Sequence, residues 1–567
     1  MLLGDDPRAL DALVGPVRRR LTRARWTQRL AEPFIRVFAP PDARLELSPA
    51  FDGHGVLVGE VFDQGGRRLG RDERRSLASR PMGPDAAKAV VSAVWGRYLL
   101  VRRGSEGAAV LRDPSGAVEA VAWRKRGVTV ITSVADAALD PLMPDDLSLD
   151  WASIAAMARQ SGEFRHELAL PPLLPVAPGE LLRLSPQGAF SWQIWRPAAI
   201  YRSRGATPGA EAIRDTVMTV VQALAGEDRW IAEVSGGLDS AVVAASLSDA
   251  QRTRVAAWVN HYVDDPEGDE RGHARAVVAG FGAGLTEVRR SGLDLDEAVF
   301  DRAACAFRPS LNDLDPAYND DIAQRITWAN ADGSLTGQGG DAVFFQMATP
   351  LIALDEMLER GRRARPGAIH RVASWTRTSA WPHVLLRAWR RHRAERRGWS
   401  HPWLDDLGGV PPAKALQISA LAYCQAFQAP AVRSRAGACV NPLLSQPIME
   451  LGLAMSSVDL TWGGRDRAAV RAAFHDRLPA GLIARRSKGE LSAFYGRAVA
   501  ANLAFLRDYI LGGALAEAGC IDQAAWSERL TPDRLLWKGG HGAILSLALT
   551  EAWARHWRAR LASRRPD

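Results

Sequence analysis

Two short stretches of the sequence combine glycines, small polar residues and an aspartate directly after an apolar run. The first stretch follows the apolar residues 230–234 and reads Ser235, Gly236, Gly237, Leu238, Asp239, Ser240. An alanine-rich run comes next, so we expect a buried strand, a tight glycine turn and a helix. This arrangement presents backbone N–H groups and a helix N-terminus to a phosphate. Because Asp239 would repel a bare phosphate, we expect a Mg²⁺ ion between the two.

The second stretch has the same character and ends in a second aspartate. It reads Ser334, Leu335, Thr336, Gly337, Gln338, Gly339, Gly340, Asp341. If both stretches end strands of one sheet, Asp239 and Asp341 supply the oxygen ligands that a hard cation bridging a pyrophosphate selects. The first stretch is not a Walker loop, because no Gly-Lys-Ser or Gly-Lys-Thr follows its glycines. The alternative interpretation of each stretch is an ordinary turn between a strand and a helix.

The residues around the first stretch predict the elements that position it. They predict helices at 210–225, 240–247 and 269–280, and strands at 230–234, 254–260 and 285–289. Strands and helices that alternate in this way are typical of a parallel, doubly wound sheet. Nucleotides bind at the carboxyl ends of the strands of such sheets. We therefore expect the backbone of Val259 to lie near an adenine ring.

The N-terminal third has a different pattern, with short apolar runs between glycine turns. It predicts strands at 34–38, 44–47, 55–62, 98–102, 108–112, 118–123 and 127–132, and helices at 85–95 and 149–159. Residues 1–33 are arginine-rich and predict a helical extension. Since 567 residues are long for one core, we expect an α/β protein with a sheet-rich domain at 34–200 and a second domain at 201–567.

Composition narrows the class of protein. Hydrophobic residues make up 47% and charged residues 24%, which is ordinary for a globular chain, and the net charge is +8. The cysteines Cys305, Cys424, Cys439 and Cys520 form no CxxC pair, which argues against a disulfide framework or a zinc site. No apolar run is long enough to cross a membrane, and none follows the basic N-terminal residues as in a signal peptide. We expect a cytoplasmic protein.

A strongly basic segment lies at about 355–400. Between residues 360 and 397 it has twelve arginines and one acid, Glu395, with Trp375, Trp381 and Trp389 among them. Three interpretations remain open: a solvated helical insertion, a dock for an acidic or aromatic peptide, and a nucleic-acid contact. We expect no nucleic-acid partner, because no recognised nucleic-acid fold accompanies the arginines.

The first stretch, 235–240, resembles the PP-loop of the ATP pyrophosphatases, which adenylate a substrate oxygen and release pyrophosphate. The second, 334–341, resembles the Gly-x-Gly-x-Asp segment of the asparagine synthetases. Residues 441–447, 465–471 and 485–489 resemble later motifs of the same family. The resemblance implies a doubly wound PP-loop ATP-pyrophosphatase domain with helical additions, which uses ATP and Mg²⁺.

The resemblance also implies roles for single residues. Asp341 would bind the metal together with Asp239, and Gly337 would lie against the nucleotide. Lys488 would reach the active site and stabilise charge on the reacting phosphate, a role that suits a compact ammonium. The alternative for Lys488 is a surface lysine in a basic loop.

The sheet-rich domain resembles the glutamine amidotransferase (Ntn-type) domain of asparagine synthetases, on residues 56–62 and 111–116. In that family a cysteine after the initiator methionine attacks the amide of glutamine. Here that residue is Leu2, about 30 residues before the first predicted strand, and no cysteine precedes Cys305. We therefore expect a domain that lacks the nucleophile, makes no ammonia and serves a structural or substrate-shaping role.

Loss of the cysteine points to three relatives: β-lactam synthetases, carbapenam synthetases and lasso peptide cyclases. The β-lactam formers carry a Tyr–Glu base pair, which would align near Gln338 and Ala438 and is absent. A peptide α-amine, whose pKa is about 7.7–8.0, needs little help from a base. The chain resembles the lasso cyclases best.

The resemblance to lasso cyclases implies a macrolactam synthetase. It would adenylate an Asp or Glu side chain of a precursor peptide, and the N-terminal amine would then close an isopeptide ring and release AMP. The partners that it implies are the precursor peptide, a leader peptidase and a leader-recognition protein. The alternatives are an asparagine-synthetase-like or β-lactam-type enzyme acting on a small substrate, and a non-catalytic protein that binds ATP.

Overall fold

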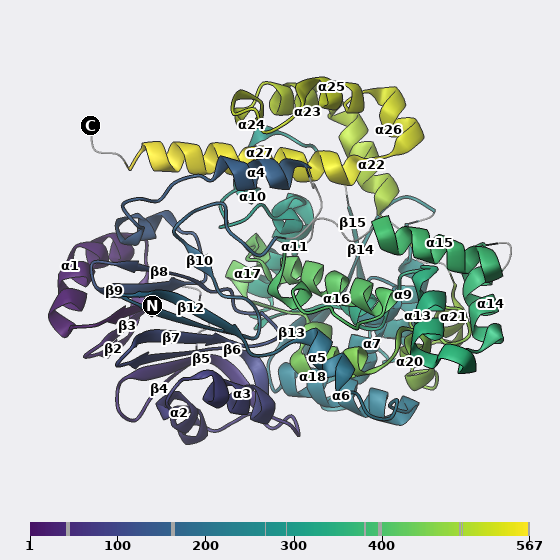
Figure 1. Ribbon diagram of the computed structural model, residues 1–567, viewed down its shortest axis with the longest axis horizontal. Coiled ribbons are helices and arrows are strands. Elements are labelled where there is room, and N and C mark those ends of the chain that lie inside the picture. Colours follow the sequence, from purple (N-terminus) through teal and green to yellow (C-terminus); the bar gives the residue numbers. More distant parts are fainter. Residues whose placement is uncertain are drawn as a thin grey trace.

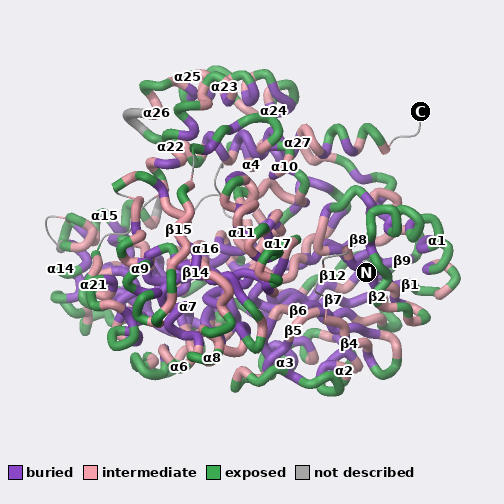
Figure 2. Tube along the Cα trace, turned by 180° about the vertical axis from the view of Figure 1, so that it is seen from behind, coloured by how far each residue is buried: buried purple, intermediate pink, exposed green. Residues whose placement is uncertain are grey.

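A computed structural model describes residues 1–40, 43, 46–159, 165–266, 268–290, 292–378, 381–394, 400–486, 489 and 491–564. Figure 1 shows the N-terminal strands at one side, a second sheet surrounded by helices at the other, and a layer of C-terminal helices above both. Buried residues run continuously from β6 and β7 of the N-terminal part to helix α7 of the second part (Figure 2). The two parts therefore share one hydrophobic core.

Two antiparallel sheets form the N-terminal part. In the described part of the chain, their strand orders are β10-β8-β9-β1-β3-β2 and β12-β11-β7-β6-β5-β4. The strands are β1 (Leu2–Gly4), β2 (Thr27–Glu32), β3 (Ile35–Ala39), β4 (Leu47–Pro49), β5 (Gly55–Asp63), β6 (Val94–Gly104), β7 (Gly107–Arg112), β8 (Val121–Lys125), β9 (Val128–Thr132), β10 (Leu174–Pro175), β11 (Glu180–Ser185) and β12 (Gly188–Gln193). Apolar side chains of both sheets, such as Val37, Val58 and Ile131, are buried together, as in a sandwich.

Helices cover this sandwich. They are α1 (Pro7–Arg23), α2 (Arg71–Ser79) and α3 (Pro84–Ala93), whereas α4 (Trp151–Arg159) and α5 (Pro197–Arg202) contact helices of the C-terminal part. Helix α2 contacts β5 and α3 contacts β6, whereas α1 contacts β1 and β9 of the other sheet. Most strands expected between residues 34 and 132 are present within a few residues of their expected bounds.

The first residues of the chain differ from the sequence-based expectation. Residues 1–33 contain helix α1 as expected, but they also contain β2, which pairs with β3, and β1, which pairs with both β3 and β9 and so lies inside a sheet. Leu2 and Leu3 are each 1% exposed. The sheet therefore begins at Leu2, and not about 30 residues later as expected. A strand of three residues is too short to show the alternation by which strands are recognised in a sequence.

The third sheet is parallel throughout, in the order β15-β14-β13-β16-β17. Its strands are β13 (Trp230–Glu233), β14 (Val255–Tyr262), β15 (Leu285–Arg289), β16 (Gly333–Leu335) and β17 (Ala438–Val440). The helices along this part are α6 (Ala210–Ala225), α7 (Leu238–Ser246), α8 (Asp249–Arg252), α9 (Arg271–Ala279), α10 (Glu297–Ala303), α11 (Pro316–Trp328), α12 (Gly340–Val343), α16 (Pro412–Cys424) and α17 (Val432–Ala436). The mixed α/β class and the strands expected near 230, 254 and 285 are found.

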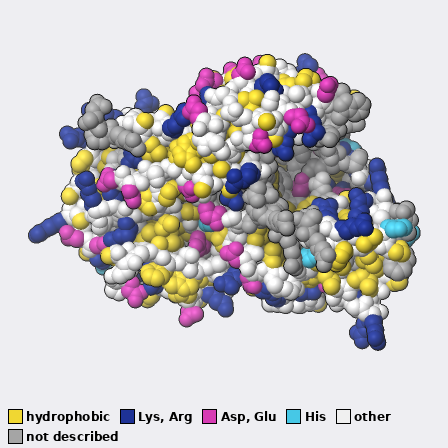
Figure 3. All heavy atoms as spheres, turned by 45° about the horizontal axis from the view of Figure 1, so that its top comes forward, with side chains coloured by type: hydrophobic (Ala, Val, Ile, Leu, Met, Phe, Trp, Pro, Cys, Tyr) yellow, Lys and Arg dark blue, Asp and Glu magenta, His cyan; other side chains and the backbone are white. Residues whose placement is uncertain are grey.

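The basic segment folds as helices α13 (Leu351–Arg360), α14 (Pro366–Trp375) and α15 (Trp381–Ala394). Each buries one apolar face, including Ile352, Ile369 and Val384. Figure 3 shows basic and apolar side chains together at the end of the molecule where α14 and α15 lie in Figure 1. Leu386 and Trp389 remain 44% and 47% exposed there. One-sided burial is typical of a packed helical insertion with a solvated outer face.

The remaining helices are α18 (Gln446–Ala454), α19 (Ser457–Leu460), α20 (Ala468–Ala473), α21 (Ala480–Ala484), α22 (Ser492–Ala501), α23 (Leu503–Leu511), α24 (Ala514–Glu517), α25 (Gln523–Arg529), α26 (Pro532–Lys538) and α27 (His541–Ala562). Helix α27 contacts α4 and α10 and crosses over both parts (Figure 1). The indole N–H groups of Trp553 and Trp557 both donate to the carbonyl of Ala306, at 3.0 and 3.1 Å. Among the described residues no single helix is long and apolar enough to span a membrane. One pair of helical segments, 492–501 and 503–517, together has the length and composition of a span but is bent between the two.

Candidate functional site

The loop between β13 and α7 is closed by its own hydroxyl groups. The N–H of Ser235 donates to Ser240 Oγ at 3.1 Å, and the N–H of Gly237 donates to Ser235 Oγ at 3.2 Å. Gly236 has a φ of +89°, and a Cβ there would lie 2.3 Å from the carbonyl oxygen of Glu270. Only glycine fits at that position. The loop ends at Leu238, the first residue of α7, and all residues of this helix are buried.

Asp239 and Asp341 meet at one edge of the third sheet. Asp239 is in the first turn of α7, and Asp341 is in the first turn of α12. The strands that precede them, β13 and β16, are parallel neighbours, so both helices start at the same edge. A Cβ on Gly337 would lie 2.3 Å from the backbone nitrogen of Ser240, and one on Gly340 would lie 2.5 Å from Asp239 Cγ. Glycines therefore allow the two loops to interlock.

A buried arginine links the two carboxylates. Arg467 Nη1 donates to Asp239 Oδ2 at 2.7 Å and to Asp341 Oδ1 at 2.8 Å. Burial alone would lower the pKa of the Arg467 guanidinium, but the charges of Asp239, Asp341 and Asp466 outweigh it and raise the pKa. The sequence placed Arg467 in a family motif at 465–471 without assigning it a role. Nothing in its neighbours along the chain indicates contacts 228 and 126 residues away.

The carboxylate pair fits a Mg²⁺ ion that is shared with a nucleotide. Mg²⁺ in nucleotide sites is commonly held by one or two carboxylates together with phosphate oxygens and waters. Asp239 and Asp341 converge on a single nitrogen atom, and the side chain of Asp341 is 46% exposed, so the pair is open on one side. Across the part of the chain that the structure describes, no group of three or more His, Cys, Asp or Glu side chains could hold an ion without such help.

The expected roles of Lys488 and Val259 stay predictions. Lys488 lies outside the described residues. Its neighbour Gly489 donates its N–H to Glu270 Oε1 at 2.6 Å, and Arg485 pairs with the same oxygen at 2.7 Å. Because the carbonyl oxygen of Glu270 also lies against Gly236, Glu270 connects residues 485 and 489 to the loop after β13.

The carbonyl of Val259 accepts the N–H of Val234 at 2.8 Å and so continues the sheet toward this loop.

A tyrosine and a glutamate are paired on the other side of β13. Tyr318 OH donates to Glu233 Oε2 at 2.6 Å, and the Arg433 guanidinium lies over the Tyr318 ring at 5.1 Å. Burial, and then the charge of Glu233, raise the pKa of Tyr318 well above its ordinary value. Tyr318 therefore keeps its proton at neutral pH and acts as a hydrogen-bond donor within the fold.

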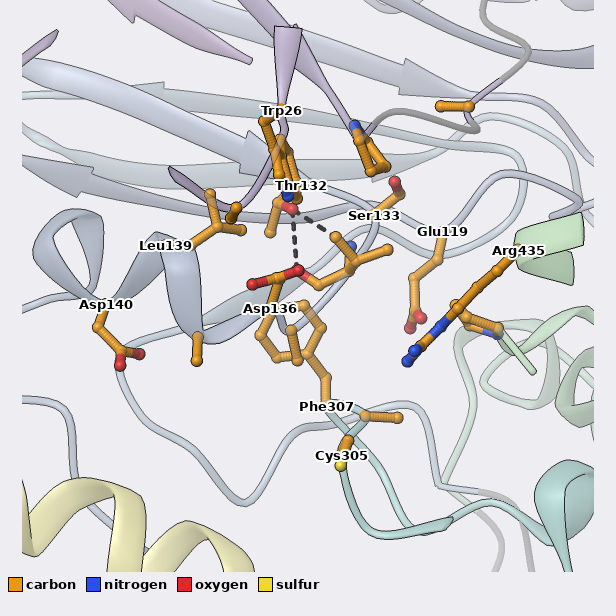
Figure 4. A pocket seen from close by; sticks show the side chains of 18 of the residues that line it. Trp26, Glu119, Thr132, Ser133, Asp136, Leu139, Asp140, Cys305, Phe307 and Arg435 are labelled. Atoms are coloured by element: carbon orange, nitrogen blue, oxygen red, sulfur yellow. Dashed lines mark hydrogen bonds between the residues drawn. The ribbon is translucent and has the colours of Figure 1, made fainter. Parts of the chain in front are cut away.

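A separate cavity of about 1330 Å³ lies between the first sheet, helix α27 and the segment after α10. Figure 4 shows Trp26, Leu139 and Phe307 around it, with Asp136 and Arg435 among its polar groups. Neither Asp239 nor Asp341 lines it. The cavity exceeds the roughly 300–1,000 Å³ of ordinary small-ligand sites. Because neither aspartate lines this cavity, the carboxylate pair is a separate site and stays the candidate reaction site.

Comparison with known proteins identifies the second part of the chain. A family model described as asparagine synthase matches residues 213–555, which is more than half of the 567 residues. No curated protein matches the chain. The solved structure described as the allosteric regulatory enzyme of purine biosynthesis is 14% identical, over 53% of this chain and 72% of its own, with a TM-score of 0.18. A similarity this low adds nothing to the argument.

Proposed function

The chain belongs to the asparagine synthase family of ATP-dependent, AMP-forming amide ligases, and we propose that it is a lasso peptide cyclase. It would adenylate an Asp or Glu side chain of a precursor peptide and join that carboxyl to the peptide's N-terminal amine. The observation that carries the ligase assignment is the pair Asp239 and Asp341, which meet beside the glycine loop at 235–240.

We propose that residues of the third sheet bind and activate ATP. The N–H groups of the loop and the start of α7 would hold the phosphates, since a helix N-terminus favours an anion. Asp239 and Asp341 would hold Mg²⁺, which neutralises charge on the departing pyrophosphate when bound. The substrate carboxylate attacks the α-phosphate, and the α-phosphate–pyrophosphate bond breaks. Lys488 would stabilise the charge that develops there.

The second half-reaction, in which the amine displaces AMP, would need no strong general base. The peptide's N-terminal amine attacks the acyl-adenylate, and AMP leaves with the bonding electrons. An α-amine with a pKa of about 7.7–8.0 is partly neutral at pH 7 and needs no strong base to react. Support for a peptide amine comes from the absence of the Tyr–Glu base pair of the β-lactam formers, which by the resemblance would align near Gln338 and Ala438. The enzyme's main contribution would be to hold the two reacting ends together.

The N-terminal sheets would have a structural role and no catalytic one. They contain no cysteine, because the first cysteine of the sequence is Cys305, and Leu2 is buried in β1. We propose that this part helps to confine the precursor peptide. A leader peptidase and a leader-recognition protein would deliver that peptide.

The test is a reconstitution with the precursor peptide, the leader peptidase, ATP and Mg²⁺. A cyclase yields a product lighter than the linear core by one water, together with AMP and pyrophosphate. Formation of ADP and phosphate would refute AMP-forming chemistry. ATP–pyrophosphate exchange that responds to free aspartate but not to peptide would favour an enzyme acting on a small substrate. A protein that binds ATP and releases no AMP would be a binding protein only.

A further inference from the structure

Arg467 stands where the proposed function requires a metal ion. Its Nη1 atom lies 2.7 Å from Asp239 Oδ2 and 2.8 Å from Asp341 Oδ1. A guanidinium that donates to both carboxylates neutralises part of their charge in the protein without nucleotide. The position between two carboxylate oxygens is the one that a bridging cation would take.

Arg467 is held firmly in this position. Its side chain is 3% exposed, and its Nε and Nη2 atoms both lie 2.8 Å from Asp466 Oδ2. Arg471 in turn pairs with Asp466 at 3.0 Å. The backbone of Arg467 has a φ of +50°, a left-handed conformation that is uncommon for a residue with a side chain. Its N–H donates to the carbonyl of Phe345 at 3.2 Å. The fold thus directs this guanidinium at the carboxylate pair.

The arrangement has a consequence for metal binding. A dication that approached Asp239 and Asp341 alone would meet the positive charge of Arg467 a few ångströms away, where repulsion is strong. A nucleotide brings phosphate oxygens with several negative charges to the same edge. These can ligate the ion and offset the guanidinium charge.

We propose that Arg467 is an internal counter-cation that makes Mg²⁺ binding at Asp239 and Asp341 depend on nucleotide. Arg467 acts through the two carboxylates and is a positioning residue. The inference rests on the proposed function, because that function places ATP at the loop 235–240. Free Mg²⁺ would not occupy the site, and the metal would enter together with the triphosphate.

The test measures metal binding directly, with Mn²⁺ as an electron paramagnetic resonance probe. In the unaltered protein we expect weak Mn²⁺ binding alone and strong binding with a non-hydrolysable α,β-methylene ATP. Arg467→Met should bind Mn²⁺ without nucleotide at least about tenfold more tightly, since one positive charge is gone. Adding Asp341→Asn to Arg467→Met should remove this gain. Arg465→Met is the matched control: Arg465 donates to the carbonyls of Ile483 and Arg485 rather than to the carboxylate pair, and the affinity should not change.

Two results would overturn the inference. One is strong Mn²⁺ binding to the unaltered, nucleotide-free protein, which needs no variant and is decisive even if Arg467→Met does not fold. The other is an unchanged affinity in a folded Arg467→Met or Arg467→Gln. A failure of the proposed function looks different. If the ATP analogue does not bind, or no peptide is cyclised, the function fails, while the nucleotide-free comparison of Arg467→Met with the unaltered protein still decides the role of Arg467.

Discussion

Replacing Asp239 by asparagine separates the chemical role of this carboxylate from its structural one. The substitution keeps the shape and one acceptor oxygen but removes the charge. Arg467 would keep its 2.8 Å contacts with Asp341 and Asp466, so its guanidinium is not left alone. A hydrogen bond to a charged group contributes about 1.5–3 kcal/mol. Because the asparagine oxygen still accepts, we expect a destabilisation near the lower end of that range.

The expected effect of Asp239→Asn on chemistry is larger. Loss of one of two protein ligands should lower the rate of AMP formation at least about 100-fold, which is about 2.7 kcal/mol at 1.36 kcal/mol per factor of ten. Single-turnover AMP release and thermal unfolding, measured on the same samples, separate the two effects. Asp249→Asn is the control, because that side chain is 97% exposed. Near-normal AMP formation by folded Asp239→Asn would refute the metal assignment. Asp341→Asn should behave alike, and the double variant should be scarcely slower than either single one.

Three further predictions concern other sites. Lys488→Met should slow AMP formation by about 2.7–4 kcal/mol in activation free energy while ATP still binds, and normal single-turnover rates would identify Lys488 as a surface residue. Gly337→Ala should reduce both ATP binding and thermal stability, because its Cβ would lie 2.3 Å from the Ser240 nitrogen. Gly272→Ala, in helix α9 with nothing within 4 Å, should leave ATP binding unchanged and should not lower stability, because alanine is favoured over glycine in a helix by about 0.5–1 kcal/mol. Burial lowers the pKa of His401 to about 3 in the folded protein, whereas the pKa of an exposed histidine is about 6.5. Between these two pH values the imidazole binds a proton in the unfolded chain but not in the folded one. The stability contribution is therefore complete above pH 6.5 and lost as the pH falls toward 3, with a slope of about 1.4 kcal/mol per pH unit. His401→Gln should reduce the pH slope of the urea unfolding free energy over that range without abolishing it, because burial also lowers the pKa of the neighbouring His166. An unchanged slope would contradict the buried neutral state.

The sequence predicted the parts of the fold that depend on local pattern. The segments near 230 and 254 are mostly apolar, the segment near 285 follows a glycine-rich turn, and the structure has β13, β14 and β15 there. The strand at Leu2–Gly4 was missed because it is short and is held by partners at 35–36 and 128–130. Pairing of this kind is set by tertiary contacts that no local window contains.

The candidate site was predicted in its loops but not in its charge balance. Asp239 and Asp341 were chosen because each follows a glycine turn after a strand. Arg467 was not, because its contacts depend on where the chain returns after α19 and on a left-handed backbone at one residue. The metal and nucleotide roles of these residues stay predictions, as does the role of Lys488.

The two indoles of α27 that share the Ala306 carbonyl have a consequence for local unfolding. The segment around Ala306 joins α10 to the chain that lines the large cavity, yet its hydrogen-bond donors are 247 and 251 residues away. Movement of α27 away from α10 would break both hydrogen bonds to this carbonyl. Exchange of the two indole N–H protons should therefore follow the opening of the last long helix. Because residues 555–560 of α27 also line the cavity, a protease that removed α27 would take away one wall and release the segment around Ala306 as well.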